Sequence, residues 1–107
     1  TEFVATAIGA VNAQTALSMS EDASASVSGS VGTHKVCTNA ASVTFQLPAG
    51  ATAGQRCKAT FTNALTSNVI DPGAEKLFGV AGTRTVNARN ASVEFTYVNA
   101  TIGWVYA

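Results

Sequence analysis

The chain has 107 residues, of which 47% are hydrophobic and only 11% are charged. Six Lys and Arg balance six Asp and Glu, so a single neutral domain is expected, without the basic face that nucleic-acid binding requires. The uncharged stretch over residues 3–20 contains too many Thr, Ser, Asn and Gln residues to span a bilayer. We therefore expect neither a nucleic-acid nor a membrane partner.

Two units are predicted: an N-terminal arm, or first strand plus bend, over residues 1–22, and a β-sandwich domain over residues 23–107. The arm is apolar and uncharged over residues 3–20, which suits docking by strand addition. Its candidate docking residues are Phe3, Val4, Ile8, Val11 and Leu17. Glu21 and Asp22 are adjacent and would face opposite ways in a strand, so we predict a solvated bend there and not an acid/base pair.

Residues 23–31, ASASVSGSV, alternate small apolar residues with Ser, which predicts a strand with a shallow core face. Gly32 and Thr33 can reverse the chain, and residues 34–38, HKVCT, form the predicted return strand of a hairpin. The only histidine, His34, lies in this return strand. We predict a surface or structural role for it, because no Ser-Asp or Cys-Asp arrangement lies near it in the sequence.

The middle of the chain contains the clearest strands. SVTFQL (42–47) alternates with Val43, Phe45 and Leu47 on one face, and it ends at Pro48, which cannot donate to a sheet ladder. Residues 55–63 place Cys57, Ala59 and Phe61 inward in the same way. A short strand is predicted over residues 68–71. Residues 74–82 are predicted as a loop with an apolar plug formed by Leu77, Phe78 and Val80.

Four of the eight aromatic residues lie in the last 13 positions. After a strand at residues 83–88, residues 91–98 alternate, and a turn at 99–103 leads to a last strand, so the chain ends in a hairpin. The five aromatics predicted to be core are Phe45, Phe61, Phe95, Tyr97 and Trp104. The alternative is that Trp104 and Tyr106 are exposed as a platform for a carbohydrate or a partner.

Turn residues recur about every eight to twelve positions, which predicts an all-β fold, either a sandwich or a barrel. Of the two, we expect a single antiparallel β-sandwich. The chain contains no phosphate-binding glycine motif, and its acids are scattered. We therefore assign no catalytic, cofactor-binding or metal-binding residues and expect no enzyme activity. Two cysteines, Cys37 and Cys57, lie in predicted strands, either as buried thiols or as a disulfide.

Residues 43–107 resemble modules of tailed-bacteriophage virion proteins. The resemblance rests on VTFQLPAGATAGQRCKATFTN and VNARNASVEFTYVNATIGWVYA. In such modules a strand ends in a Leu-Pro-x-Gly turn, a GQR strand follows, and an Asn-x-Ser-Val-x-Phe-x-Tyr-Val segment precedes a closing Gly-Trp strand. The resemblance implies a virion structural protein with a jelly-roll-like sandwich, similar to capsid decoration (cement) proteins and to tail-fibre modules.

A decoration protein would bind and stabilise the outer capsid shell. Its expected partners are the major capsid protein and further copies of itself, without a cofactor or a small-molecule substrate. It would be synthesised in the host bacterial cytoplasm, where Cys37 and Cys57 would stay reduced, and would end on the outer capsid surface. The alternative is a tail-fibre or receptor- and glycan-binding virion module.

Overall fold

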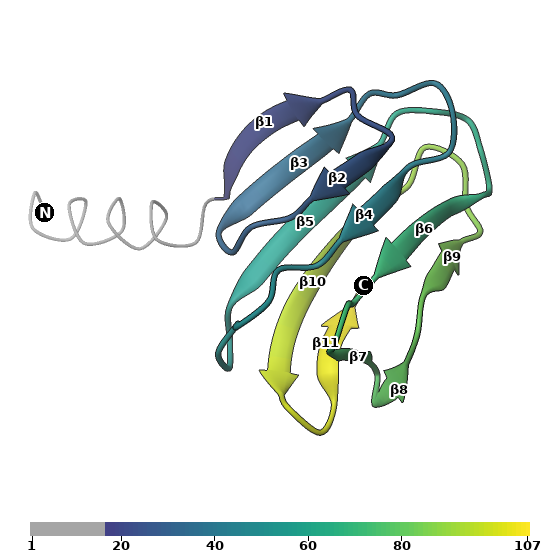
Figure 1. Ribbon diagram of the computed structural model, residues 1–107. Helices are drawn as coiled ribbons and strands as arrows, with labels where there is room; N and C mark the ends of the chain where they lie inside the picture. Colours follow the sequence, from purple (N-terminus) through teal and green to yellow (C-terminus); the bar gives the residue numbers. More distant parts are fainter. Residues whose placement is uncertain (1–16) are drawn as a thin grey trace, which may run out of the picture.

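The computed structural model describes residues 17–107, which form two β-sheets that face each other (Figure 1). No helix occurs within this part of the chain, and the all-β prediction is confirmed. The strands are β1 (Ser18–Asp22), β2 (Ser26–Ser28), β3 (Thr33–Cys37), β4 (Thr44–Gln46), β5 (Arg56–Phe61), β6 (Asn68–Asp71), β7 (Lys76–Leu77), β8 (Val80–Ala81), β9 (Arg84–Val86), β10 (Ser92–Asn99) and β11 (Gly103–Tyr106). One sheet has the order β1-β3-β5-β10-β11-β7-β8, and the other has the order β2-β4-β6-β9.

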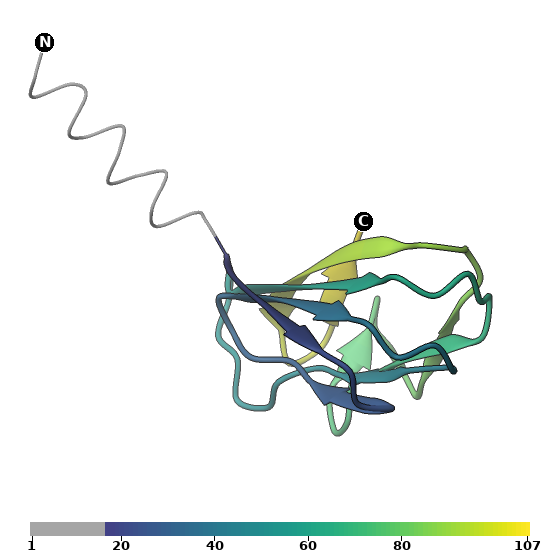
Figure 2. The ribbon, with the colours of Figure 1, turned by 90° about the horizontal axis from the view of Figure 1, so that it is seen from above.

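The first six strands wind as a parallel coil. Odd-numbered strands lie in the seven-stranded sheet and even-numbered strands in the four-stranded sheet, so the chain passes from one layer to the other after each strand (Figure 2). Each of the first four strands pairs in parallel with the strand two positions further on, as in β1 with β3 and β2 with β4. The prediction of an exclusively antiparallel sandwich is therefore wrong. A jelly-roll order, which is built from antiparallel strands, is not confirmed.

The hairpin predicted between residues 23–31 and 34–38 is also wrong. Residues 26–28 form β2 in the four-stranded sheet, whereas residues 33–37 form β3 in the other sheet. The chain crosses between the layers at Gly32, which has a φ of +79°, and the Thr33 N–H donates to the Ser30 carbonyl at 3.1 Å. Turn residues allow a reversal, but they do not indicate which sheet the next strand joins.

The bend predicted at Glu21 and Asp22 is a strand. Both residues belong to β1, where they lie opposite Val36 and Cys37 of β3. The bend comes directly afterwards, where the Asp22 carboxylate accepts a hydrogen bond from the Ser24 N–H at 2.9 Å. The segment SMSED has no apolar alternation, so the ladder to β3 supplies the stabilisation that its sequence pattern does not indicate.

The strands after the coil are mainly antiparallel and close the fold. β10 pairs with β5 on one side and with β11 on the other, so the C-terminal hairpin is confirmed. Its register places Tyr97 opposite Trp104 and Phe95 opposite Tyr106. Trp104 also lies opposite Leu77 of β7, and Ala107 exchanges backbone hydrogen bonds of 3.2 Å with Glu94. The end of the chain is therefore held by strands on both sides of β11.

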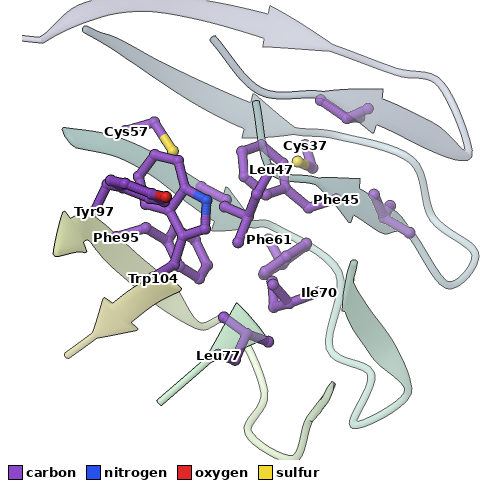
Figure 3. Close-up of a cluster of buried hydrophobic side chains, with 13 residues drawn as sticks. Cys37, Phe45, Leu47, Cys57, Phe61, Ile70, Leu77, Phe95, Tyr97 and Trp104 are labelled. Carbon is purple, nitrogen blue, oxygen red and sulfur yellow. The ribbon is translucent and has the colours of Figure 1, made fainter. Parts of the chain in front are cut away.

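The core lies between the two sheets and receives side chains from both (Figure 3). The Phe45 ring of the four-stranded sheet stacks on the Phe95 ring of the other sheet, with centroids 5.8 Å apart and planes at 14°. The five aromatics assigned to the core lie in it: Phe45, Phe61, Phe95 and Trp104 are 0% exposed and Tyr97 is 6% exposed. The inward faces expected for SVTFQL and for residues 55–63 are confirmed, because all six predicted residues are buried.

A pair of buried amides, which the sequence analysis did not identify, joins the loop between β3 and β4 to the loop between β5 and β6. The Asn68 Nδ2 donates to the Asn63 Oδ1 at 2.8 Å, and the Asn63 Nδ2 donates to the Asn68 Oδ1 at 3.0 Å. The Asn68 Oδ1 also accepts from the Val43 N–H, and the Asn63 Nδ2 donates to the carbonyls of Asn39 and Ala41. The pair thereby satisfies backbone groups of the loop between β3 and β4 with side chains from just after β5 and from the start of β6.

Replacement of Asn68 by alanine should lower the free energy of unfolding by about 2–4 kcal/mol. The Asn68 side chain is 0% exposed. Its removal breaks three hydrogen bonds, one with the Val43 N–H and two with the Asn63 amide. Urea unfolding followed by circular dichroism measures the loss. The matched control is Asn87→Ala, an exposed amide for which we expect a change within about 0.5 kcal/mol. A similar, small effect at both positions would contradict the proposed role of the pair.

Candidate functional site

The most unusual surface feature is an exposed aromatic side chain at the turn between β7 and β8. Of the three residues predicted as an apolar plug, only Leu77 is buried, at 0% exposed. Phe78 is 49% and Val80 54% exposed, so the plug prediction is wrong for these two residues. A two-residue hairpin turn separates Leu77 from Val80 and turns the Phe78 side chain outward. The Phe78 ring meets the Tyr106 ring edge-on, with centroids 4.9 Å apart and planes at 75°.

The backbone of this turn is unfavourable for phenylalanine. Phe78 has a φ of +49° and Gly79 a φ of +77°, the signs of a type I′ turn, in which Asn-Gly is the preferred pair. The left-handed conformation costs a residue with a Cβ about 1–2 kcal/mol. The turn is held in place because the Phe78 N–H donates to the Trp104 carbonyl at 2.9 Å and the Gly79 N–H to the Ile102 carbonyl at 2.8 Å. A bulky residue in this conformation is a marker of functional sites.

Two hollows in the surface share Tyr106 in their lining, and Phe78 lines the second of them. The first has a volume of about 260 Å³ and combines the apolar side chains of Ile70, Val86 and Val93 with the polar ones of Arg84 and Asn87. The second is more open, with a volume of about 330 Å³, and is lined by Phe78, Glu94, Thr96 and Val105. We call Phe78, Tyr106 and these two hollows the aromatic surface.

The polar groups of the aromatic surface include both donors and acceptors. The Arg84 Nη1 donates to the Tyr106 hydroxyl at 3.4 Å, and its Nη2 donates to the Leu77 carbonyl at 3.5 Å. In the second hollow, Glu94 accepts a hydrogen bond from the Arg56 Nη1 at 2.9 Å, so its charge is balanced by a cation. The surface therefore has no strong excess of either charge.

A second group of polar side chains crosses the outer face of the seven-stranded sheet. The His34 Nε2 and the Thr60 Oγ1 are 2.7 Å apart, and the Thr60 Oγ1 lies 2.8 Å from the Ser92 Oγ. Partial burial and the Lys58 ammonium lower the pKa of His34, which favours the neutral ring. Thr60 stands between the imidazole and Ser92, so His34 does not contact Ser92 as a base would contact a nucleophile. We interpret the group as a hydrogen-bonded row that joins β3, β5 and β10.

The two cysteines are free thiols, and each is fully buried. Burial raises the pKa of Cys37 to about 11, with a smaller contribution from the Asp22 carboxylate. Burial likewise raises the pKa of Cys57 to about 12, with Glu94 as the second cause. The sequence left open whether Cys37 and Cys57 are buried thiols or form a disulfide, and in the structure they are buried thiols. Neither thiol has the exposure or the lowered pKa of a reactive cysteine.

The buried thiols should make the fold sensitive to alkali. An unfolded thiol titrates near pH 9.0, whereas the folded ones titrate at about 11 and 12. The contribution of the buried thiols to the free energy of unfolding is fully present below pH 9. It falls above pH 9, because the thiols of the unfolded chain lose their protons at a lower pH than those of the folded chain. Urea unfolding between pH 8 and 10.5 measures this decline. Cys57→Ala should show a shallower decline with pH, whatever its stability at pH 8, and an unchanged slope would contradict the assignment.

The structure places the sequence-predicted binding residues in different regions. Phe3, Val4, Ile8 and Val11 lie outside the described residues, and Leu17, the first described residue, is half-buried. Trp104 is 0% exposed, so the prediction of an exposed platform is wrong for the tryptophan, whereas its partner Tyr106 is half-buried and lines both hollows.

Sequence analysis missed the exposure of Phe78. The signal was present, since Phe78-Gly79 stands between two short apolar segments, which is the pattern of a two-residue hairpin.

No group of three or more His, Cys, Asp or Glu side chains is placed to hold a metal ion within residues 17–107. In the same part of the chain, no helix has the length and hydropathy needed to cross a membrane. No protein-family model matches this chain, and no curated protein matches it. The function is therefore inferred from the geometry of the described residues together with the resemblance to virion modules.

Proposed function

We propose that the chain is a non-enzymatic recognition module of a tailed-bacteriophage virion, which attaches the particle to a host receptor through the aromatic surface. The virion assignment rests on the resemblance over residues 43–107. The choice of receptor binding rests on one observation, which is the exposed Phe78 ring held at a positive φ against Tyr106.

This observation favours recognition because a local rule of turn chemistry is broken at an exposed position. Asparagine would fit the first position of the turn better, and a polar residue would be better solvated there. Phenylalanine therefore contributes little to folding apart from its contact with Tyr106. Local choices that conflict with the fold are expected at functional sites, and exposed aromatic residues are typical of binding surfaces.

Capsid decoration is the second candidate, and a different region favours it. Met19 on the edge strand β1 is 66% exposed, and Val31 at the same end of the coil is 38% exposed. An edge strand has unpaired backbone groups on its outer side, and these can accept another strand. Together with the zero net charge, these exposed apolar side chains would suit packing against a capsid shell.

Binding of the labelled chain to cells and to shells separates the two candidates. We expect wild-type protein to adsorb to cells of susceptible strains in a bacterial panel, and Phe78→Asn to adsorb at least about ten-fold less. Met19→Gln, which changes an exposed apolar side chain of β1, is the matched control and should adsorb like wild type. Equal adsorption of Phe78→Asn and wild type would contradict receptor binding through this surface. Binding to empty phage shells that is lost in Met19→Gln and kept in Phe78→Asn would favour decoration instead.

A further inference from the structure

The aromatic surface has the chemical features of a site for sugar rings. An aromatic face carries negative charge density, and the C–H groups on one side of a pyranose ring are weakly positive, so the two stack. Phe78 is half exposed, and its edge-on contact with Tyr106 leaves ring surface uncovered. A sugar lying on Phe78 would be next to the Tyr106 ring, whose hydroxyl lies beside Arg84, and would enter the hollow that Phe78 lines.

The polar groups around the two rings match hydroxyl groups better than charged groups. Sugar hydroxyls donate and accept, and the surface offers a guanidinium donor at Arg84, a carboxylate acceptor at Glu94 and the hydroxyls of Tyr106 and Thr96. Recognition of an acidic sugar or a phosphate would be expected to use several cations. Arg84 is the one cationic side chain among the residues that line the two hollows.

The size of the hollows also favours a saccharide as the ligand. Pockets that enclose a drug-sized ligand have volumes of about 300–1,000 Å³ and bury most of the ligand. The two hollows, at about 260 and 330 Å³, lie near the lower end of this range, and both are lined by Tyr106. Each hollow is therefore large enough for one ring of an extended chain, with the rest of the chain exposed to solvent.

From these features we infer that the aromatic surface binds an uncharged saccharide, with one ring stacked on Phe78 and hydroxyl groups bonded to Arg84 and Tyr106. This inference rests on the proposed receptor-binding function and specifies the chemistry of the receptor. A saccharide of the bacterial surface and a free oligosaccharide share this chemistry.

The test is an array of immobilised neutral oligosaccharides, built from hexoses and N-acetylhexosamines, together with acidic ones that contain uronate or sialate. The full-length chain is presented on a streptavidin tetramer, because multivalent display reveals weak binding. We expect wild-type protein to be retained on one or more neutral saccharides. Phe78→Asn should reduce retention about ten-fold, and Tyr106→Phe, which keeps the ring and removes the hydroxyl, should reduce it about three-fold.

Two controls keep a loss of binding distinct from a loss of folding. Phe78→Asn should melt within about 4 °C of wild type, because the better turn residue offsets the lost ring contact. Met19→Gln should be retained like wild type. Free oligosaccharide of the retained type should compete with adsorption to cells.

The outcomes separate this inference from the proposed function. Retention on acidic saccharides alone, or equal retention of Phe78→Asn and wild type, would overturn the inference. Adsorption to cells that depends on Phe78 but is unaffected by periodate oxidation of the cell-surface sugars would also overturn it, while receptor binding would stand. A Phe78-dependent interaction with a cell-surface protein would likewise overturn the inference while receptor binding would stand, whereas one with a capsid protein would contradict both.

Discussion

Replacement of Trp104 by alanine should destabilise the fold by about 3–5 kcal/mol. The indole is 0% exposed, and it meets the Tyr97 ring edge-on with centroids 5.3 Å apart. It lies on β11 between β10 and β7, so its removal opens a cavity at the junction of the three strands that close the seven-stranded sheet. Denaturant unfolding followed by far-UV circular dichroism measures the loss without depending on tryptophan fluorescence.

A conservative variant separates ring volume from hydrogen bonding at this position. The Trp104 Nε1 is buried and has no hydrogen-bond partner among the described residues, so the N–H contributes a desolvation cost. Trp104→Phe removes this group together with part of the ring, and we expect it to cost less than half as much as alanine. A loss below about 1 kcal/mol for Trp104→Ala would contradict the buried position and would restore the exposed platform as an explanation.

Replacement of Gly103 by alanine should cost about 2–5 kcal/mol, for two separate reasons. Gly103 is buried and has a φ of +75°, a conformation that costs a residue with a Cβ about 1–2 kcal/mol. An added Cβ would also overlap the backbone of Lys76, since it would lie 2.7 Å from both the nitrogen and the carbonyl carbon of that residue. Overpacking of this kind adds about 1–3 kcal/mol. The thermal midpoint and the free energy of unfolding should both fall.

Gly50 provides a matched control for the conformational part of this effect. Its φ is +73°, nearly the same as that of Gly103, but an added Cβ would have no atom within 4 Å. Gly50→Ala should therefore lose only the conformational contribution of about 1–2 kcal/mol. The difference between the two variants measures the steric conflict between β11 and β7. Equal losses would mean that the two strands can separate without cost.

The candidate site was only partly predictable from the sequence. The hypothesis of an aromatic binding surface near the C-terminus named Trp104 and Tyr106 together. The structure separates them: Trp104 is in the core, and Tyr106 meets Phe78, which lies 28 positions earlier in the chain. The alternation of side chains along one strand could not reveal this contact, because the contact depends on how the hairpin of β7 and β8 lies against β11.

The sequence by itself determined which residues of the clear strands face the core. Alternation placed Val43, Phe45 and Leu47 inward, and it did the same for β5 and for Phe95 and Tyr97 of β10, because successive side chains of any strand point to opposite faces. This period of two depends only on the local backbone and is the same for parallel and antiparallel strands.

Only the tertiary structure decided how the strands are connected. The direction of pairing depends on backbone hydrogen bonds between residues far apart in the chain, such as Lys35 opposite Ala59, and no side-chain pattern encodes these bonds. The parallel coil, the strand β1 in a segment without apolar alternation and the contact of Phe78 with Tyr106 all follow from such long-range pairing. The local pattern specifies an inside and an outside for each strand, whereas the choice of neighbour depends on packing of the whole chain.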